Sequence, residues 1–209
     1  MKSGYTHISM LLDRSGSMDS IKSFIIEGFN NFIKDQKKEA GELSVTLVQF
    51  DTDYEVLFDF KGINDIPLLT DKIYIPRGMT ALNDSWVKLI EETGAKLASY
   101  KEEDRPEKVL LISLSDGLEN ASKKYAPPEG DKFIKDLVER QEKDYNWKFL
   151  YIGANQDSKK EGALRGVNNF MNFAGNEKSI RTMSASLSAE TSNYRSRKDN
   201  SFNVKVDEN

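Results

Sequence analysis

The sequence contains no cysteine and a single histidine, His7, among its 209 residues. The absence of cysteine excludes disulfides, thiolate zinc sites, iron–sulfur clusters and cysteine nucleophiles. One histidine cannot build a multi-histidine metal site or an H-E-x-x-H helix. A metal site in this chain would therefore rely on oxygen ligands.

Basic residues are not in excess, because 30 lysines and arginines stand against 34 acidic residues and give a formal net charge of -4. Nucleic-acid-binding domains usually carry a basic excess, so we expect no nucleic-acid partner. No stretch approaches the roughly 18 apolar residues that a membrane-spanning helix needs. The apolar run Ile8–Leu12 is shorter than the core of a signal peptide. We expect a cytoplasmic protein that does not bind a membrane.

The length of the chain predicts one folded unit that needs no disulfide or structural metal to fold. Hydrophobic residues make up 38% of the sequence and charged residues 31%, which is polar for a globular chain, but 11 Phe, 8 Tyr and 2 Trp supply a bulky core. We expect a domain over residues 1–198 and a polar tail over 199–209. In the tail, Ser201–Val206 has the alternative of pairing as an edge strand.

Predicted strands and helices alternate along the chain. Short apolar or β-branched runs indicate strands, and apolar residues that recur at spacings of three and four indicate helices. The predicted strands are Tyr5–Leu12, Leu43–Phe50, Tyr54–Phe60, Lys108–Ser115, Trp147–Gly153 and Asn168–Phe173. The predicted helices are Ser20–Glu39, Asn83–Tyr100, Asp131–Tyr145, Asp157–Leu164 and Asn176–Arg197, and Gly62–Pro76 is expected to be largely irregular.

Strands separated by helices predict an α/β fold, a Rossmann-like open sheet of about six mostly parallel strands with helices on both faces. The Asp51–Asp53 turn, whose carboxylates need no ligand, makes Tyr54–Phe60 a hairpin partner, so we expect that strand to be antiparallel and at an edge. Ligands of such sheets bind outside the carboxyl ends of the strands. The loops that follow the strands are therefore the places to look for a site.

Three of these loops carry oxygen-bearing side chains. Asp13, Ser15 and Ser17 follow the first strand, Thr80 precedes the second helix, and Asp116 follows the strand that is apolar throughout. Two carboxylates and three hydroxyls are hard ligands that suit Mg²⁺, Mn²⁺ or Ca²⁺. Two carboxylates would neutralise a divalent ion, and the weakly binding hydroxyls would leave it electrophilic.

Each loop taken alone also has a simpler interpretation. Ser15 or Ser17 could cap the first helix, and Asn83 or Asp84 could cap the second. The segment Ser115-Asp116-Gly117 could be an ordinary turn at the end of a strand. The three loops together, each after the expected strand, favour a metal site more strongly than any one of them.

The set Asp13-x-Ser15-x-Ser17, Thr80 and Asp116 resembles the metal ion-dependent adhesion site (MIDAS) of von Willebrand factor A domains. In that family an Asp-x-Ser-x-Ser motif follows the first strand, a threonine lies in a middle loop, and an aspartate follows the fourth strand. The segments LLDRSGSM and SDGLEN resemble the corresponding segments of small stand-alone prokaryotic and phage members. The resemblance covers about residues 5–173, and it departs from the family at position 79, where a methionine stands in place of a frequent second glycine.

The resemblance implies a protein-binding module without catalytic activity. The hydroxyls of Ser15, Ser17 and Thr80 would contact Mg²⁺, with Mn²⁺ or Ca²⁺ as other candidates, and Asp13 and Asp116 would act directly or through water. An Asp or Glu of a partner protein would complete the coordination. Similar small domains are associated with AAA+ ATPases, with tellurite-resistance-type stress operons and with phages, and these are the partners that the resemblance suggests.

An enzyme is the main alternative: a Mg²⁺-dependent phosphoryl-transfer protein that uses Asp13 as its nucleophile. Against this alternative, Ser15 stands where such enzymes have a second aspartate, and no general acid or lysine lies at a recognisable spacing. A third interpretation is a degenerate domain that binds no metal, which the complete set of five residues disfavours.

Other polar residues have weaker assignments. His7 lies on the first predicted strand and is expected to be packed there. Arg14 either steers an acidic partner toward the metal or is simply solvated. Glu119 and Asp84 lie near the predicted site in sequence and could support its ligands. Arg195-Ser196-Arg197-Lys198 is a basic cluster at a helix end, where cations are favoured, and it leaves a minor alternative of nucleic-acid contact.

Overall fold

The computed structural model describes residues 1–154 and 157–206, so residues 207–209 of the predicted tail lie outside the described residues. Within these residues, seven strands form one sheet in the order β3-β2-β1-β4-β5-β6-β7. The strands are β1 (Lys2–Asp13), β2 (Glu42–Phe50), β3 (Tyr54–Gly62), β4 (Pro106–Ser115), β5 (Lys148–Ala154), β6 (Phe170–Phe173) and β7 (Lys205–Val206). The helices are α1 (Lys22–Gln36), α2 (Leu82–Ser99), α3 (Glu129–Tyr145), α4 (Ser158–Leu164) and α5 (Glu177–Ser196).

The topology confirms the predicted α/β class. Neighbouring strands run parallel, except that β3 pairs antiparallel with β2 at one edge of the sheet. The six predicted strands all form. Of the segment Ser201–Val206, which was considered as an edge strand, Lys205–Val206 forms the short edge strand β7. The first helix begins later than predicted, because Gly16–Ile21 forms a 3₁₀ turn and α1 starts only at Lys22.

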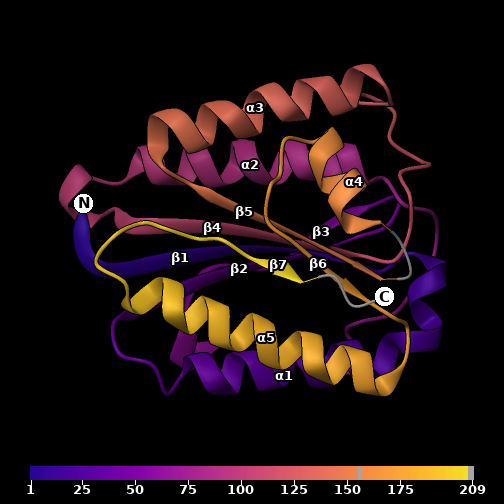
Figure 1. Cartoon of the computed structure of the whole chain (residues 1–209), viewed down its shortest axis with the longest axis horizontal. Helices are drawn as coiled ribbons and strands as arrows, with labels where there is room; N and C mark the ends of the chain where they lie inside the picture. The colour runs from indigo at the N-terminus through magenta and orange to yellow at the C-terminus, as the bar shows by residue number, and fades with distance from the viewer. Residues whose placement is uncertain (155–156, 207–209) are drawn as a thin grey trace.

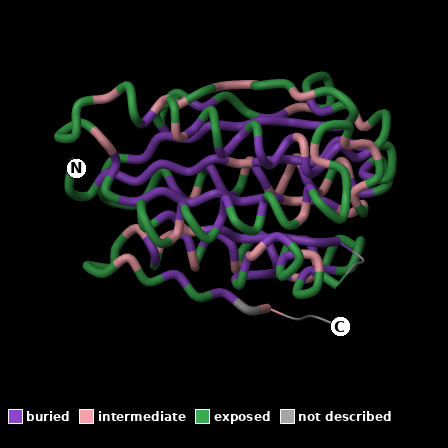
Figure 2. The backbone as a smooth tube through the Cα atoms, turned by 90° about the horizontal axis from the view of Figure 1, so that it is seen from above, coloured by how far each residue is buried: buried purple, intermediate pink, exposed green. Residues whose placement is uncertain are grey.

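Helices cover both faces of the sheet, as Figure 1 shows. Helices α1 and α5 pack side by side on one face, and α2 and α3 cover the other. The buried residues follow the strands through the middle of the molecule, whereas each helix buries only one side (Figure 2). Each layer is therefore amphipathic in the way that a three-layer α/β fold requires.

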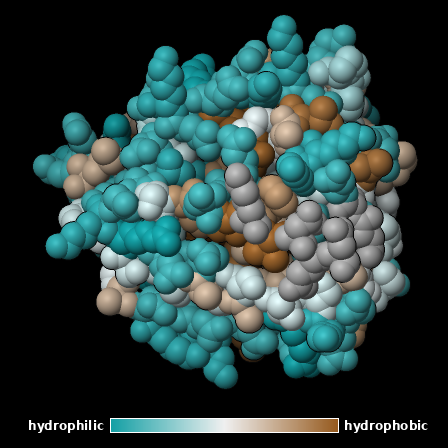
Figure 3. Space-filling view, viewed as in Figure 1, coloured by the Kyte–Doolittle hydropathy of each residue, from teal (hydrophilic) through white to brown (hydrophobic). Residues whose placement is uncertain are grey.

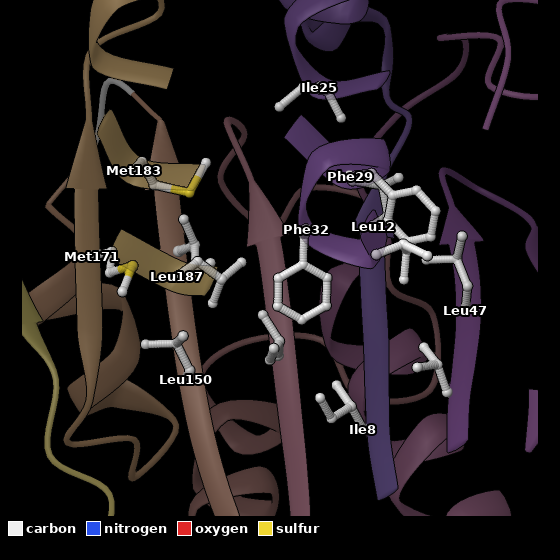
Figure 4. Close-up of a cluster of buried hydrophobic side chains, with 14 of the residues drawn as sticks. Ile8, Leu12, Ile25, Phe29, Phe32, Leu47, Leu150, Met171, Met183 and Leu187 are labelled. Atoms are coloured by element: carbon white, nitrogen blue, oxygen red, sulfur yellow. The ribbon is translucent and has the colours of Figure 1, made fainter. Parts of the chain in front are cut away.

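The face under α1 and α5 is filled by side chains from both helices and from the strands beneath them. In Figure 4, Phe29 and Phe32 of α1 and Met183 and Leu187 of α5 lie over the strands. Burial of one such side chain stabilises the fold by about 1.5–3 kcal/mol. The opposite face is organised by the fully buried Trp86 of α2, whose indole nitrogen donates a hydrogen bond to Ser113 Oγ at 3.1 Å.

Two basic side chains fix the C-terminal end of α5. Arg195, from the predicted basic cluster, donates hydrogen bonds to the carbonyl oxygens of Gln36, Ala40 and Gly41 at the end of α1. The buried Lys108 of β4 donates from Nζ to the carbonyl oxygen of Tyr194 at 2.7 Å. Cations are favourable at helix C-termini because the exposed carbonyls carry negative partial charge. The guanidinium of Arg195 is thus engaged in hydrogen bonds within the fold.

The segment after α5 remains attached to the sheet. Phe202 and Val204 are buried, and Phe202 packs edge-on against Tyr194. The amide of Val204 donates to Asn169 Oδ1 at 2.9 Å, and its carbonyl oxygen accepts from the amide of Phe170 at 3.0 Å. These contacts lead the chain into β7 beside β6.

Most of the face seen in Figure 3 is hydrophilic, with hydrophobic side chains showing between the charged ones near its middle. No helix among the described residues combines the length and the apolarity that crossing a membrane requires.

His7 is packed inside the sheet layer, as predicted. Its ring is fully buried, stacks on Phe60 with a centroid distance of 3.6 Å, and is hydrogen-bonded with the hydroxyls of Ser44 and Ser9. Burial disfavours the charged imidazolium and lowers the pKa of His7 from 6.5 to about 3. The neutral ring is therefore the form that the folded state accommodates.

The lowered pKa predicts an acid-sensitive stability. The unfolded chain takes up a proton near pH 6.5 and the folded chain does not, so this contribution to stability is complete above pH 6.5 and is lost as the pH falls toward 3. Between pH 7 and pH 5 the loss amounts to about 2 kcal/mol. In urea titrations followed by tryptophan fluorescence, His7→Gln should lose about 2 kcal/mol less than the wild type over this interval. Equal losses in the two proteins would contradict the assignment.

Candidate metal centre

The candidate site lies where β1 and β4, neighbouring parallel strands, both end. Ser17 Oγ, from the loop after β1, donates a hydrogen bond to Asp116 Oδ1 at 2.6 Å. In return, Ser115 Oγ, at the end of β4, donates to Asp13 Oδ2 at 2.5 Å. The two loops that the sequence places far apart are therefore joined by a reciprocal pair of bonds, as the predicted parallel arrangement requires.

The loop after β1 turns back on its own aspartate. The amide of Ser15 donates to Asp13 Oδ1 at 2.6 Å, and the hydroxyls of Ser15 and Ser17 lie 3.1 Å apart. No side-chain hydrogen bond caps the 3₁₀ turn at Ser15 or helix α1 at Ile21. The capping interpretation of these serines is therefore wrong, since their hydroxyls face the neighbouring loop.

Thr80 is held from both sides by the loop that follows β4. Its amide donates to Asn120 Oδ1 at 2.9 Å, and its carbonyl oxygen accepts from the amides of Asn120 and Ala121. Gly78, two residues earlier, has a φ of 66°. A side chain there would be strained and would press on Thr52 and Asp51. The turn therefore fixes where Thr80 enters the site.

Hydroxyl groups from the loop after β1 and from the loop of Thr80 converge at Gly117, in the loop after β4. A Cβ atom added to Gly117 would lie 2.8 Å from Thr80 Oγ1 and 3.7 Å from both Ser15 Oγ and Ser17 Oγ. The space beside this glycine is thus a cradle bounded by three hydroxyl oxygens. All five residues predicted from the sequence meet at this edge of the sheet. Their role as metal ligands stays a prediction.

The electrostatics of the cradle favour a cation. Burial raises the pKa of Asp13 from 3.8 to about 6, although hydrogen bonds from Ser115 and Ser15 oppose the shift and nearby Asp116 adds to it. Burial also raises the pKa of Asp116. Across residues 1–154, 157–204 and 206, no lysine or arginine forms an ion pair with either carboxylate. A divalent cation would compensate the charge that the protein leaves unpaired.

Arg14 is not solvated, which was one of the two alternatives considered from the sequence. It is buried, and its Nε donates to Asp51 Oδ2 at 3.2 Å while its Nη1 pairs with Glu55. Arg77 Nε also donates to Asp51 Oδ2, at 2.8 Å, and the amide of Asp53 donates to Asp51 Oδ1 at 2.6 Å. Arg14 is therefore not solvated, because it is paired with a buried carboxylate of the hairpin turn.

Glu119 and Asp84 organise the loops around the cradle. Glu119 Oε2 accepts from the amide of Asn83 at 2.7 Å, at the start of α2, and Glu119 Oε1 accepts from the amide of Ala121. Asp84 accepts from three successive amides, those of residues 123–125. The predicted capping of α2 by Asn83 or Asp84 is wrong, because the helix receives its cap from Glu119 and from Ser122, whose Oγ accepts from the amide of Asp84.

Three residues that support the candidate site were not predicted from the sequence. Ser115 donates to Asp13, Asn120 accepts from the amide of Thr80, and the buried Tyr74 donates from its hydroxyl to the carbonyl oxygen of Asp13 at 2.5 Å. Ser115 offered a signal, because it is a polar residue at the very end of an apolar strand. Tyr74 offered none, since its contact spans 61 positions through an irregular connector.

No protein-family model matches the sequence, and no curated protein matches it significantly. Solved structures do resemble the fold. VWA2, an ArnB paralogue from Sulfolobus acidocaldarius, is 18% identical with a TM-score of 0.56 over 88% of this chain and 44% of its own. A von Willebrand factor type A protein from Catenulispora acidiphila is 11% identical, with a TM-score of 0.60 over 90% of this chain and 42% of its own.

Proximal thread matrix protein 1 from the mussel byssus, in a structure with a zinc-occupied MIDAS motif, is 14% identical with a TM-score of 0.60, over 90% of this chain and 46% of its own. The chain spans less than half of the length of each of these proteins. At these identities the likeness concerns architecture alone. The fold of this chain is that of von Willebrand factor A domains, with the mostly parallel sheet and the single antiparallel edge strand described above.

The buried ion pairs at Asp51 predict a large asymmetry between two aspartates of one turn. Asp51→Ala would leave Arg14 buried without its buried partner and should lower the free energy of unfolding by about 3–5 kcal/mol. Asp53→Ala is the matched control, because the Asp53 side chain is 74% exposed and the Asp51 side chain 1% exposed; its effect should stay within about 1 kcal/mol. Urea titrations of both variants measure the difference. Equal destabilisation would show that Asp51 does not hold Arg14.

Proposed function

We propose that this chain is a non-catalytic binding module that holds a divalent metal ion and uses it to engage an acidic residue of a partner protein. Asp13, Ser15, Ser17, Thr80 and Asp116 would hold the ion. One observation carries the proposal: the buried carboxylate of Asp13 and the half-buried carboxylate of Asp116, neither paired with a described lysine or arginine, adjoin a cradle of three hydroxyl oxygens. The bonds that now join these groups, Ser17 to Asp116 and Ser15 to Ser17, bring them within reach of one ion.

Mg²⁺ is the ion that we favour. The donors are all hard oxygens, which suit Mg²⁺, Mn²⁺ and Ca²⁺ better than softer metals. Three clustered oxygens at one glycine also suit a small ion. The zinc found in the MIDAS motif of proximal thread matrix protein 1 supports divalent binding by this fold in general, and the choice of ion for this chain rests on its own donors.

An acidic partner follows from the charge of the donors. Two carboxylates balance the charge of a divalent ion, and the three hydroxyls are neutral. The site as a whole therefore does not attract a further carboxylate by its net charge. A partner's carboxylate would have to bind the metal ion directly. Mg²⁺ releases water reluctantly, and a charged oxygen is the ligand that displaces water most readily. The net charge of -4 acts at long range and is screened beyond about 8 Å at physiological salt. Proteins of the AAA+, stress-operon or phage classes are candidates for this partner.

Phosphoryl transfer is disfavoured by the surroundings of Asp13. A nucleophilic aspartate needs an acid or base within reach, and Asp13 is bonded by the hydroxyl of Ser115 and the amide of Ser15. The only histidine, His7, is enclosed by Ser44, Ser9 and Phe60 within the sheet layer. Burial and hydrogen bonding hold Asp13 in place rather than expose it for attack.

Metal binding is the direct test. In calorimetric titrations with Mn²⁺ or Mg²⁺, the wild type should bind one ion and Asp13→Ala should show no measurable binding, because one of two charged donors is lost. Asp19→Ala is the matched control, since Asp19 lies in the 3₁₀ turn Gly16–Ile21, six residues after Asp13, but is exposed, and it should bind as the wild type does. Circular dichroism checks that both variants are folded. Unchanged affinity in folded Asp13→Ala would remove Asp13 from the site.

The absence of catalysis is tested separately. With Mg²⁺ or Mn²⁺ present, hydrolysis of p-nitrophenyl phosphate and ATP should remain at the level of buffer with metal alone. Asp13→Asn should leave this background unchanged. Metal-dependent turnover that is well above background in the wild type and lost in Asp13→Asn would establish the phosphoryl-transfer alternative instead.

A further inference from the structure

The connector between β3 and α2 displays an unusual number of apolar side chains. Ten large hydrophobic residues are exposed in the part of the chain that the structure describes, and four of them lie between positions 68 and 79. They are Leu68, Ile73, Ile75 and Met79, with Leu68 66% and Met79 52% exposed. Isolated exposed apolar residues are ordinary, but a concentration of them marks an interaction surface. This one leads directly to Thr80.

Three of the four residues line a groove of about 480 Å³ between the connector and the hairpin. Leu68, Ile73 and Ile75 of the connector line it together with Leu57 and Phe58 of β3. This volume lies within the range of sites that accept side chains or small ligands, roughly 300–1,000 Å³. The groove is therefore large enough to enclose apolar groups of a bound segment.

Backbone contacts connect the groove to the loops of the candidate metal centre. Arg14 and Arg77 line it, and the amide of Arg77 donates to the carbonyl oxygen of Arg14 at 2.7 Å. Arg14 follows Asp13 in the chain. The amide of Gly16 donates to the carbonyl oxygen of Gly78 at 3.2 Å, directly before Met79 and Thr80. The connector that lines the groove therefore leads to Thr80 and is hydrogen-bonded to the loop that follows Asp13.

A second apolar residue flanks the cradle from the opposite loop. Leu118 is 58% exposed and follows Gly117, beside which the hydroxyl oxygens converge. Its loop is bonded to Thr80 through the amide of Asn120, at 3.0 Å. Met79 and Leu118 therefore lie on adjoining loops next to the proposed metal.

The charges in the groove are already paired within the chain. Arg14 is paired with Asp51 and Glu55, and Arg77 with Asp51 and Asp53. Paired charges attract a charged ligand weakly, so the groove favours apolar groups over ionic ones. Lys72 at its rim adds a positive charge that suits a partner segment of acidic character.

We propose that this groove is a second contact for the partner that binds the metal. The partner would present an Asp or Glu to the ion, with apolar side chains beside it that enter the groove and contact Met79. The inference rests on the proposed function. It adds the sequence character of the partner: an acidic residue neighboured by aliphatic or aromatic residues, instead of an acidic residue in a polar segment.

The test uses a random-peptide display library as the probe. Clones are selected on the wild-type protein in Mg²⁺ and eluted with EDTA. They are then measured as synthetic peptides by fluorescence anisotropy against wild type, Leu68→Ser/Ile75→Ser and the control Leu164→Ser. Leu164 is exposed like the groove residues but lies on α4, which packs on β5 and β6, far across the sheet from β3. Mn²⁺ titration and circular dichroism check that both variants keep the metal affinity and fold of the wild type.

We expect EDTA-eluted clones to carry an acidic residue next to apolar ones. They should bind Leu68→Ser/Ile75→Ser about ten-fold more weakly than the wild type, a difference of about 1.4 kcal/mol, and should bind Leu164→Ser normally. EDTA-sensitive acidic clones that bind the groove variant undiminished would overturn the groove and leave the proposed function standing.

Other outcomes separate the two proposals further. If the wild type binds metal but yields no EDTA-eluted clone, the proposed function fails and the groove inference fails with it. Clones that need the groove but bind equally in EDTA would make it an independent site and break the link to the metal. Sedimentation that shows a dimer of the wild type, lost in Leu68→Ser/Ile75→Ser, would assign the groove to a second copy of this chain.

Discussion

The buried carboxylate of Asp51 joins the segments on which the candidate site is built. It accepts hydrogen bonds from Arg14, which follows β1, and from Arg77, which precedes the loop of Thr80. The backbone carbonyl oxygen of Asp51 accepts a hydrogen bond from the amide of Ala81, at the start of α2, at 3.0 Å. A buried charge must keep its partners, because losing one leaves an unpaired ion in a medium of low polarity. The position of Thr80 relative to Asp13 is therefore set by an aspartate that does not belong to the site.

Aspartates thus have two different environments in one corner of this fold. Asp51 is matched by arginines, and the chain itself satisfies its charge. From the residues that the structure describes, Asp13 and Asp116 receive hydroxyl and amide hydrogen bonds and no ion pair, and burial raises the pKa of both. Carboxylates that a protein buries without a cation are either protonated or serve a ligand that supplies the charge. The contrast between the two environments is what distinguishes a structural ion pair from a candidate metal centre.

The architecture explains why this corner is available for binding. Parallel strands bring their carboxyl ends to one edge, and the helices on both faces leave that edge to the loops. The surrounding polar groups hold these loops together: Glu119 caps α2 from the loop after β4, and Asp84 accepts the next amides of that same loop. The connector buries Ile66, Leu69 and Tyr74 in the core, whereas its side chains Leu68, Ile73 and Ile75 stay exposed. A partner surface can therefore vary in sequence without disturbing the sheet.

The sequence alone determined the α/β class, the antiparallel edge strand and the meeting of five residues, because these follow from strand order and from the fixed direction of parallel strands. It could not determine which carboxylates are satisfied internally. Arg14 and Asp51 are 37 positions apart, and their pairing depends on how the β2–β3 hairpin turns toward β1. The support from Tyr74 depends on the path of an irregular connector that has no periodic pattern. Local spacing specifies the strands, helices and loops, whereas burial and pairing of polar side chains are decided only when distant loops pack together.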